Sequence, residues 1–190
     1  MTKEKITRSE LKEKRTANRK VFENQDHSRT VEIYMEPVHY EDEDGSWKEM
    51  DDTLEEVAFG RSIGGTGNRK FCNNKGKLAI QLMDSAEPAV TASLTMDTCA
   101  LRWGMEGAAA SVKAEKTEDN LVTYPGIFEN TDLQCRVHGE GLKEDIILHS
   151  PEAVREEYAM LYQMTEVTPV LENNCVHFLD TDGEEVFCVH

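Results

Sequence analysis

Residues 175–190 read CVHFLDTDGEEVFCVH, and this stretch indicates the fold more directly than any other. Two short alternating runs, 176–179 and 185–189, flank the turn-forming sequence Asp180-Thr181-Asp182-Gly183. An Asp-Gly pair between two alternating runs is a strong local signal for an antiparallel hairpin, because glycine accepts the backbone angles of a tight turn. We therefore predict a two-stranded antiparallel hairpin over these residues.

The same period of two recurs along the chain from Arg29 onward. A second acidic turn, EDEDGS at 41–46, also separates two such runs, and residues 30–35 alternate as a half-buried strand does. The other runs that predict strands are 38–40, 47–50, 78–82, 90–103, 121–124, 133–137, 142–148 and 158–164. The glycine-rich segment 60–69 predicts a surface loop, and Ser150-Pro151-Glu152 predicts a single helical turn. About ten short strands with little helix predict an all-β fold, an antiparallel β-sandwich, with a supersandwich as its larger variant.

Charge is unevenly distributed along the chain. The 190 residues carry 21 basic and 37 acidic side chains, a formal net charge of −16 at pH 7, yet residues 1–20 hold eight basic and three acidic ones. We therefore predict a short basic N-terminal arm at 1–20 and a single β-sandwich domain at 21–190. An acidic surface repels phosphate backbones and anionic lipid headgroups, so we expect neither nucleic acid nor a membrane surface as a partner.

Apolar segments are short throughout the sequence. No run approaches the roughly 20 residues that a membrane-spanning helix needs, so we expect no membrane insertion. The basic start, with Lys3, Lys5 and Arg8, leads into Glu10 instead of an apolar segment, so we expect this chain to lack a secretory signal. With 38% hydrophobic residues the chain has enough apolar side chains for a modest core, which excludes global disorder.

Several sequence blocks resemble one known family. The blocks are RTANRKVF at 15–22, EPVHY at 36–40, WK at 47–48, YPGIFENTDL at 124–133, GLKEDIIL at 141–148 and VHFLDTDG at 176–183. Together they resemble the N-terminal β-rich module of large bacterial wall-associated and RHS (YD-repeat) surface proteins, where the module precedes DNRLRE domains and repeat arrays. The resemblance spans residues 10–190. It departs from the family in the missing signal peptide and in a chain that stops at His190, so we expect truncation at the C-terminal end.

This resemblance implies an extracellular or cell-wall location for the full-length protein. It implies a non-enzymatic structural or presentation module whose partners are downstream domains of the same polypeptide and cell-wall polysaccharide, without a cofactor. The alternative is a carbohydrate-binding module, and a glycoside hydrolase ranks third because no particular pair of carboxylates stands out. We identify no catalytic residue, since the six histidines are scattered and no Gly-x-Ser-x-Gly motif occurs.

Aromatic side chains are the candidates for glycan binding. Stacking on exposed rings is how β-sandwiches commonly hold sugars. The candidate residues are Trp47, Trp103, Tyr158 and Tyr162. A glycan-binding protein should present these rings in an exposed row, whereas a scaffold should bury them.

A candidate zinc site lies on the predicted hairpin at 175–190. With a two-residue loop at Asp182-Gly183, His177 faces Cys188 and Cys175 faces His190, so that all four project from one face. A flat square of ligands nevertheless converges poorly on a tetrahedral ion. With a four-residue loop Cys175 would face Cys188, and a disulfide becomes the alternative. The third alternative is semi-buried reduced cysteines, and the odd total of five cysteines leaves at least one thiol free in a monomer.

The two acidic turns make calcium a second candidate metal. In an EF-hand loop the sixth position is glycine and the first is a carboxylate. Aligning Gly45 at the sixth position puts Tyr40 first, and aligning Gly183 there puts Phe178 first. Both loops therefore fail the EF-hand pattern, and solvated Asp-Gly turns are the simpler interpretation.

Overall fold

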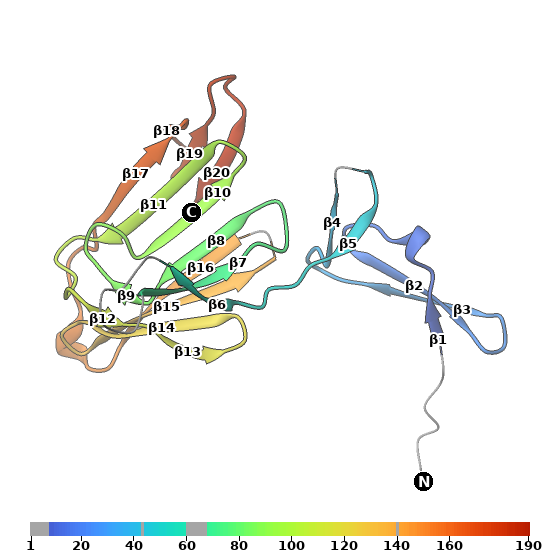
Figure 1. The fold of residues 1–190 in the computed structure, drawn as a ribbon, viewed down its shortest axis with the longest axis horizontal. Coiled ribbons are helices and arrows are strands. Elements are labelled where there is room, and N and C mark those ends of the chain that lie inside the picture. The colour runs from blue at the N-terminus through green and yellow to red at the C-terminus, as the bar shows by residue number, and fades with distance from the viewer. Residues whose placement is uncertain (1–7, 43, 60–67, 140) are drawn as a thin grey trace, which may run out of the picture. The chain divides into compact units, whose positions relative to one another are not determined.

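Antiparallel strands make up nearly all the regular structure of the residues that the computed structural model describes, which are 8–42, 44–59, 68–139 and 141–190. Figure 1 shows these strands with their labels. Helical structure in this part of the chain is limited to two single 3-10 turns, Lys12–Lys14 and Pro151–Ala153. The predicted all-β antiparallel sandwich class is confirmed. In the same residues no helix combines the length and the apolar character needed to cross a bilayer.

The division into units differs from the predicted arm and single domain. The chain separates into Met1–Asp51 and Asp52–His190. The described end of the predicted arm is part of the first unit, since Arg8–Glu10 and Arg19–Asn24 are strands of its small sheet. A basic side chain of this segment has an acidic partner there, because Arg8 pairs with Glu32 at 2.7 Å. Residues 1–7 of the predicted arm, and most of the predicted loop at 60–69, lie outside the described residues.

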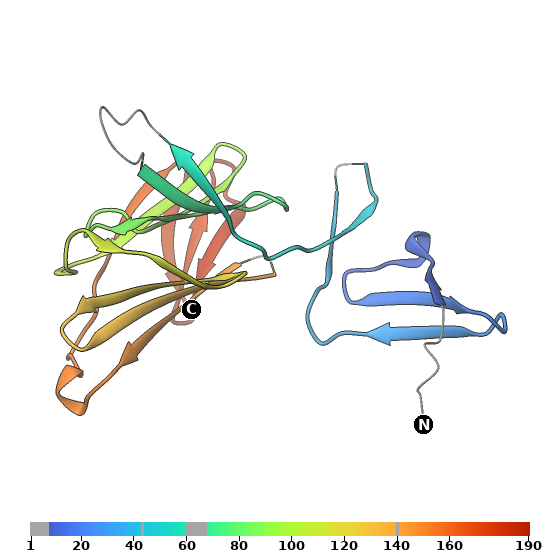
Figure 2. The same ribbon diagram turned by 60° about the horizontal axis from the view of Figure 1, so that its bottom comes forward.

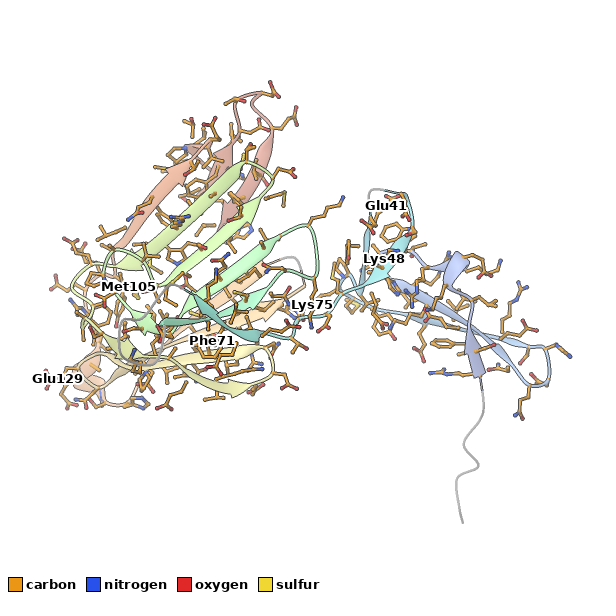
Figure 3. The ribbon with its side chains drawn as sticks, in the orientation of Figure 1. Glu41, Lys48, Phe71, Lys75, Met105 and Glu129 are labelled. Atoms are coloured by element: carbon orange, nitrogen blue, oxygen red, sulfur yellow. The ribbon has the colours of Figure 1, made fainter. Side chains whose placement is uncertain are left out.

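The first unit contains a three-stranded sheet and a hairpin. In spatial order the sheet is β1 (Arg8–Glu10), β2 (Arg19–Asn24) and β3 (Arg29–Ile33). The hairpin is β4 (His39–Glu41) and β5 (Trp47–Glu49). Glu41 and Lys48 of this hairpin are labelled in Figure 3.

Among the described residues of the first unit, Val21 is the single hydrophobic residue that is buried. Charged and polar side chains therefore hold this unit together. The Arg15 guanidinium donates to both carboxylate oxygens of Glu10 at 2.7 Å and to the carbonyl oxygen of Trp47 at 3.3 Å. The buried His39 ring hydrogen-bonds through Nδ1 to the carbonyl oxygen of Thr16 at 2.9 Å. These contacts tie the hairpin to the sheet.

The second unit contains the larger sheets. In spatial order the largest is β17 (Met160–Thr165), β11 (Cys99–Met105), β10 (Ala92–Met96), β8 (Ala79–Met83), β7 (Asn68–Asn73) and β6 (Glu55–Phe59). The next is β13 (Glu115–Glu118), β14 (Leu121–Phe128), β15 (Thr131–His138) and β16 (Gly141–Leu148). A third is β18 (Thr168–Glu172), β19 (Cys175–Leu179) and β20 (Glu185–Val189), and a short pair joins β12 (Val112–Lys113) to β9 (Ser85–Ala86).

The core of the second unit lies between these sheets, and Figure 2 shows β13–β16 as a layer facing the strands of the largest sheet. Strand β15 shows why the layers form, because Leu133, Cys135 and Val137 are buried while the residues between them face outward. Phe71 and Met105, both labelled in Figure 3, are buried in the opposite sheet. The strand alternation read from the sequence is thus the alternation between core and solvent.

Two details fix how closely the chain packs. The Tyr124 hydroxyl of β14 donates to the carbonyl oxygen of Met83 in β8 at 2.6 Å, which links the two layers inside the core. A Cβ atom at Gly104 in β11 would lie 2.3 Å from the carbonyl oxygen of Pro88. Glycine is therefore required at position 104 by the close approach of the neighbouring backbone.

Candidate functional site

The hairpin of β19 and β20 brings three metal-ligating side chains together. His177 lies opposite Cys188 in the strand register. The ligand atoms of Cys175, His177 and Cys188 all lie within 4.8 Å of one another. Next to them, Cys175 Sγ is 3.0 Å from Nδ1 of His190. Residues 176–178 and 187–189 therefore have the first of the two registers weighed from the sequence, although a register shift between Phe178 and Leu179 replaces the predicted two-residue loop. Three of the four predicted residues lie in one cluster, and His190 contacts it through Cys175.

The opposite face of the hairpin explains this arrangement. Phe178 and Phe187 are buried in the core and pair across the strands. Because side chains alternate between the two faces of a strand, burial of these rings directs Cys175, His177 and Cys188 to the other, partly exposed face. Packing of two phenylalanines thus positions the polar cluster.

Glu185 at the start of β20 completes the surroundings of the cluster. Its carboxylate Oε2 hydrogen-bonds to Nδ1 of His177. When Nδ1 carries the proton, the lone pair of the neutral imidazole is on Nε2. Partial desolvation, the Glu185 carboxylate and Cys175 all raise the pKa of the Cys188 thiol. All five cysteines are free thiols in this structure.

The acidic turns use their carboxylates for their own backbone. Oδ1 of Asp180 accepts hydrogen bonds from the main-chain N–H groups of Asp182 and Glu184 at 2.9 and 3.0 Å. Oδ1 of Asp44 accepts from the N–H of Ser46 at 2.8 Å. These contacts are typical of Asx turns and agree with the failure of both loops against the EF-hand pattern.

The four aromatic residues predicted for glycan binding do not form one group. Trp103 is buried in β11 with 5% of its surface exposed, and its ring contacts that of Tyr162 in β17. Tyr158 is half-buried against Phe128. Trp47 belongs to the first unit and is half-buried there. Glycan binding by these rings stays a prediction. Of the two tryptophans, Trp47 is the one whose ring is partly exposed to solvent.

A buried polar cluster that the sequence did not predict lies between the two main layers. The Trp103 indole Nε1–H donates to Oε1 and Oε2 of Glu144 in β16 at 3.0 and 3.1 Å. Cys135 Sγ lies 3.8 Å from Oε1 of the same carboxylate. Burial raises the pKa of Glu144, an effect that donation from Trp103 partly offsets. Burial also raises the pKa of Tyr162 to about 12, with a smaller contribution from Glu144.

Comparison with known proteins gives relatives at low identity. The tRNA(Glu)-specific nuclease WapA of Bacillus subtilis subsp. natto is 25% identical over 95% of this chain and 8% of that protein. The tRNA3(Ser)-specific nuclease WapA of Bacillus spizizenii is 24% identical with the same coverage. The Wall-associated protein of Geobacillus stearothermophilus is 27% identical over 74% of this chain and 57% of that protein. No protein-family profile matches the chain, and no solved structure matches it.

The chain is therefore similar to WapA nucleases of Bacillus and to the Wall-associated protein of Geobacillus, and the second of these agrees with the likeness to wall-associated proteins read from the sequence blocks. It spans about 8% of the length of the Bacillus relatives and 57% of the Geobacillus relative.

Two predictions from the sequence are wrong. The sequence predicted a non-enzymatic protein without a nucleic-acid partner, whereas three relatives are named tRNA nucleases. The argument from net charge concerned the surface of this chain alone. Because the chain matches only 8% of those relatives, its charge carries no information about what the remainder of such a protein binds.

Proposed function

We propose that this chain is a β-rich module that holds a bacterial surface protein at the cell wall and presents the rest of that protein there. The observation that supports this most strongly is the extent of the similarity. The match to the Bacillus relatives covers 95% of the chain, so both units belong to the matched block. The RHS repeats and DNRLRE domains of the resembling family are part of this proposal as the downstream partners.

The proposal includes an activity for the whole protein. Relatives that contain a similar block are named tRNA nucleases. We extend that activity, cleavage of tRNA, to the protein in which this module works. The wall-bound module would keep the whole protein outside the cell that makes it, where the protein can contact other cells.

The first test is a fluorescence titration of the purified chain with soluble cell-wall fragments. Trp103 is buried and Trp47 is half-buried, so a ligand that contacts the surface changes chiefly the emission of Trp47. We expect a saturable change in emission with wall fragments. Trp47→Phe is the matched variant, because it keeps an aromatic ring at the position and removes the signal.

A second titration with tRNA, followed by gel analysis of the tRNA, addresses the activity. Saturable binding or cleavage of tRNA by residues 1–190 would assign part of the nuclease function to this chain itself. No emission change with any wall fragment, with the fold intact by circular dichroism, would exclude a wall-binding surface at Trp47. Failure of the folded chain to cosediment with isolated cell walls would contradict the wall-binding role.

A further inference from the structure

We propose that the exposed face of the β19–β20 hairpin is a zinc site. Its ligands are the thiolates of Cys175 and Cys188 and the imidazole of His177, with His190 as the fourth ligand. This inference is independent of the wall-binding role, since it rests on the contacts of four side chains.

The spacing of the ligand atoms supports the site. Bonds of about 2.3 Å to sulfur and 2.0 Å to nitrogen in a tetrahedral centre put neighbouring ligand atoms about 3.5–3.8 Å apart. The three atoms from Cys175, His177 and Cys188 lie within 4.8 Å of one another. The largest of these separations exceeds the tetrahedral spacing by about 1 Å, a difference that we infer side-chain rotation closes. The sequence argument against a flat square of ligands loses its force, because the side chains converge above the sheet.

The fourth ligand follows from the strand register. His190 comes directly after β20, and its Nδ1 is 3.0 Å from Cys175 Sγ. A ring nitrogen this close to one thiol can enter the coordination sphere of an ion held by that sulfur. The resulting set of two cysteines and two histidines leaves no position open, which is the arrangement of structural zinc sites.

A second sphere of contacts is already formed around His177. The Glu185 carboxylate binds Nδ1 and leaves Nε2 as the lone-pair nitrogen. Carboxylates that accept from a metal-ligating histidine fix its tautomer and ring orientation, and they are a recurrent feature of zinc centres. Glu185 is thus a positioning residue for the site.

The chemistry of the ligands selects the metal. Thiolate and imidazole ligands favour zinc over calcium or magnesium, which bind through oxygen atoms. The consequence for the fold is local. The ion joins the two strands of a hairpin whose other face packs Phe178 and Phe187 in the core, so zinc should make the third sheet more stable.

The test uses the full 190-residue chain, reduced and freed of metal, titrated with Co²⁺ and then with Zn²⁺. Cobalt bound by two thiolates in a tetrahedral site gives strong visible and thiolate charge-transfer absorption, which zinc then abolishes by displacement. We expect one equivalent of each metal per chain and a higher thermal midpoint with zinc.

Matched variants separate this site from the other thiols. Cys175→Ser and Cys188→Ser should each abolish the charge-transfer absorption at one equivalent, whereas Cys72→Ala, which alters a thiol buried in β7, should leave it unchanged. Glu185→Gln should keep the absorption and weaken zinc binding about 10–100-fold, as loss of a partner in the second sphere does. His27→Gln removes an exposed histidine of the first unit and is the control for loss of a histidine outside the cluster, so it should leave the absorption unchanged.

Two outcomes would overturn the proposal. One is the absence of thiolate–cobalt absorption in wild-type protein that is fully reduced and folded by circular dichroism. The other is a Cys175–Cys188 disulfide found after thiol trapping in the bacterium that makes the protein, which would assign the pair to covalent cross-linking.

Discussion

Replacing Trp103 by phenylalanine removes the hydrogen-bond donor on which the Glu144 carboxylate depends. The indole Nε1–H donates to both carboxylate oxygens between the two main layers. A hydrogen bond to a charged group contributes about 1.5–3 kcal/mol to the free energy of unfolding. We therefore expect Trp103→Phe to lower the free energy of unfolding at pH 7 by that amount, together with a smaller loss of packing that does not depend on pH.

The pH dependence distinguishes the hydrogen bond from the packing. Burial raises the folded-state pKa of Glu144 above its ordinary value of 4.5. Between these two values the folded chain holds a proton that the unfolded chain releases, so wild-type stability falls as pH rises through this window. The charged hydrogen bond contributes fully above the folded-state pKa. As pH falls through that value, its contribution declines to the about 0.5–1.5 kcal/mol of a neutral hydrogen bond.

Urea unfolding followed by far-ultraviolet circular dichroism measures this directly. Wild type and Trp103→Phe are compared at pH 7 and at a pH near 4.5, and Glu144→Gln with and without Trp103→Phe serves as the control pair. We expect the cost of Trp103→Phe to depend on pH in the wild-type background and to be constant in the Glu144→Gln background. An equal cost at both pH values with Glu144 present would refute the reasoning.

Three further changes test the two units. Arg15→Met should destabilise the first unit by about 3–5 kcal/mol at pH 7, because the half-buried Glu10 carboxylate loses both hydrogen bonds from the guanidinium; hydrogen exchange of the β2 amides checks this. Arg15 lowers the pKa of Glu10, so the contribution of this ion pair to stability should be lost as pH falls through that lowered value. Protection of the wild-type β2 amides that does not change in acid would contradict this prediction. Tyr124→Phe should cost about 1–3 kcal/mol in chemical unfolding, since the carbonyl oxygen of Met83 loses the hydrogen bond from the buried Tyr124 hydroxyl. Gly104→Ala should cost about 1–3 kcal/mol, because its Cβ would meet the Pro88 carbonyl, and an unchanged thermal midpoint would exclude that close approach.

Local features of the fold could be predicted from the sequence because neighbouring residues specify them. The Asp-Gly turn at 180–183 and the strands on both sides of it appear as predicted. The same holds for the helical turn at Pro151–Ala153 and the strand at Met160–Thr165. In the hairpin the alternation also gave the faces, since Phe178 is buried and Cys175 is not.

Features that depend on packing between distant segments could not be predicted. Glu144 and Trp103 come from different sheets, so no local pattern relates them. The alternation at 30–35 predicted a half-buried strand, and β3 does form, yet Ile33 is 80% exposed. The first unit has instead a centre of charged groups around Arg15, and hydrophobic periodicity gives no signal for such a centre.

Cosedimentation of the folded chain with isolated bacterial cell walls at low and at high salt tests the wall-binding role most directly. Because the chain carries a net charge of −16, it is repelled by anionic wall polymers, and specific contacts must overcome this repulsion. We predict saturable retention that persists or increases with salt, as the repulsion is screened. A chain that stays in the supernatant at both salt concentrations, while its circular dichroism spectrum shows it to be folded, would contradict the account.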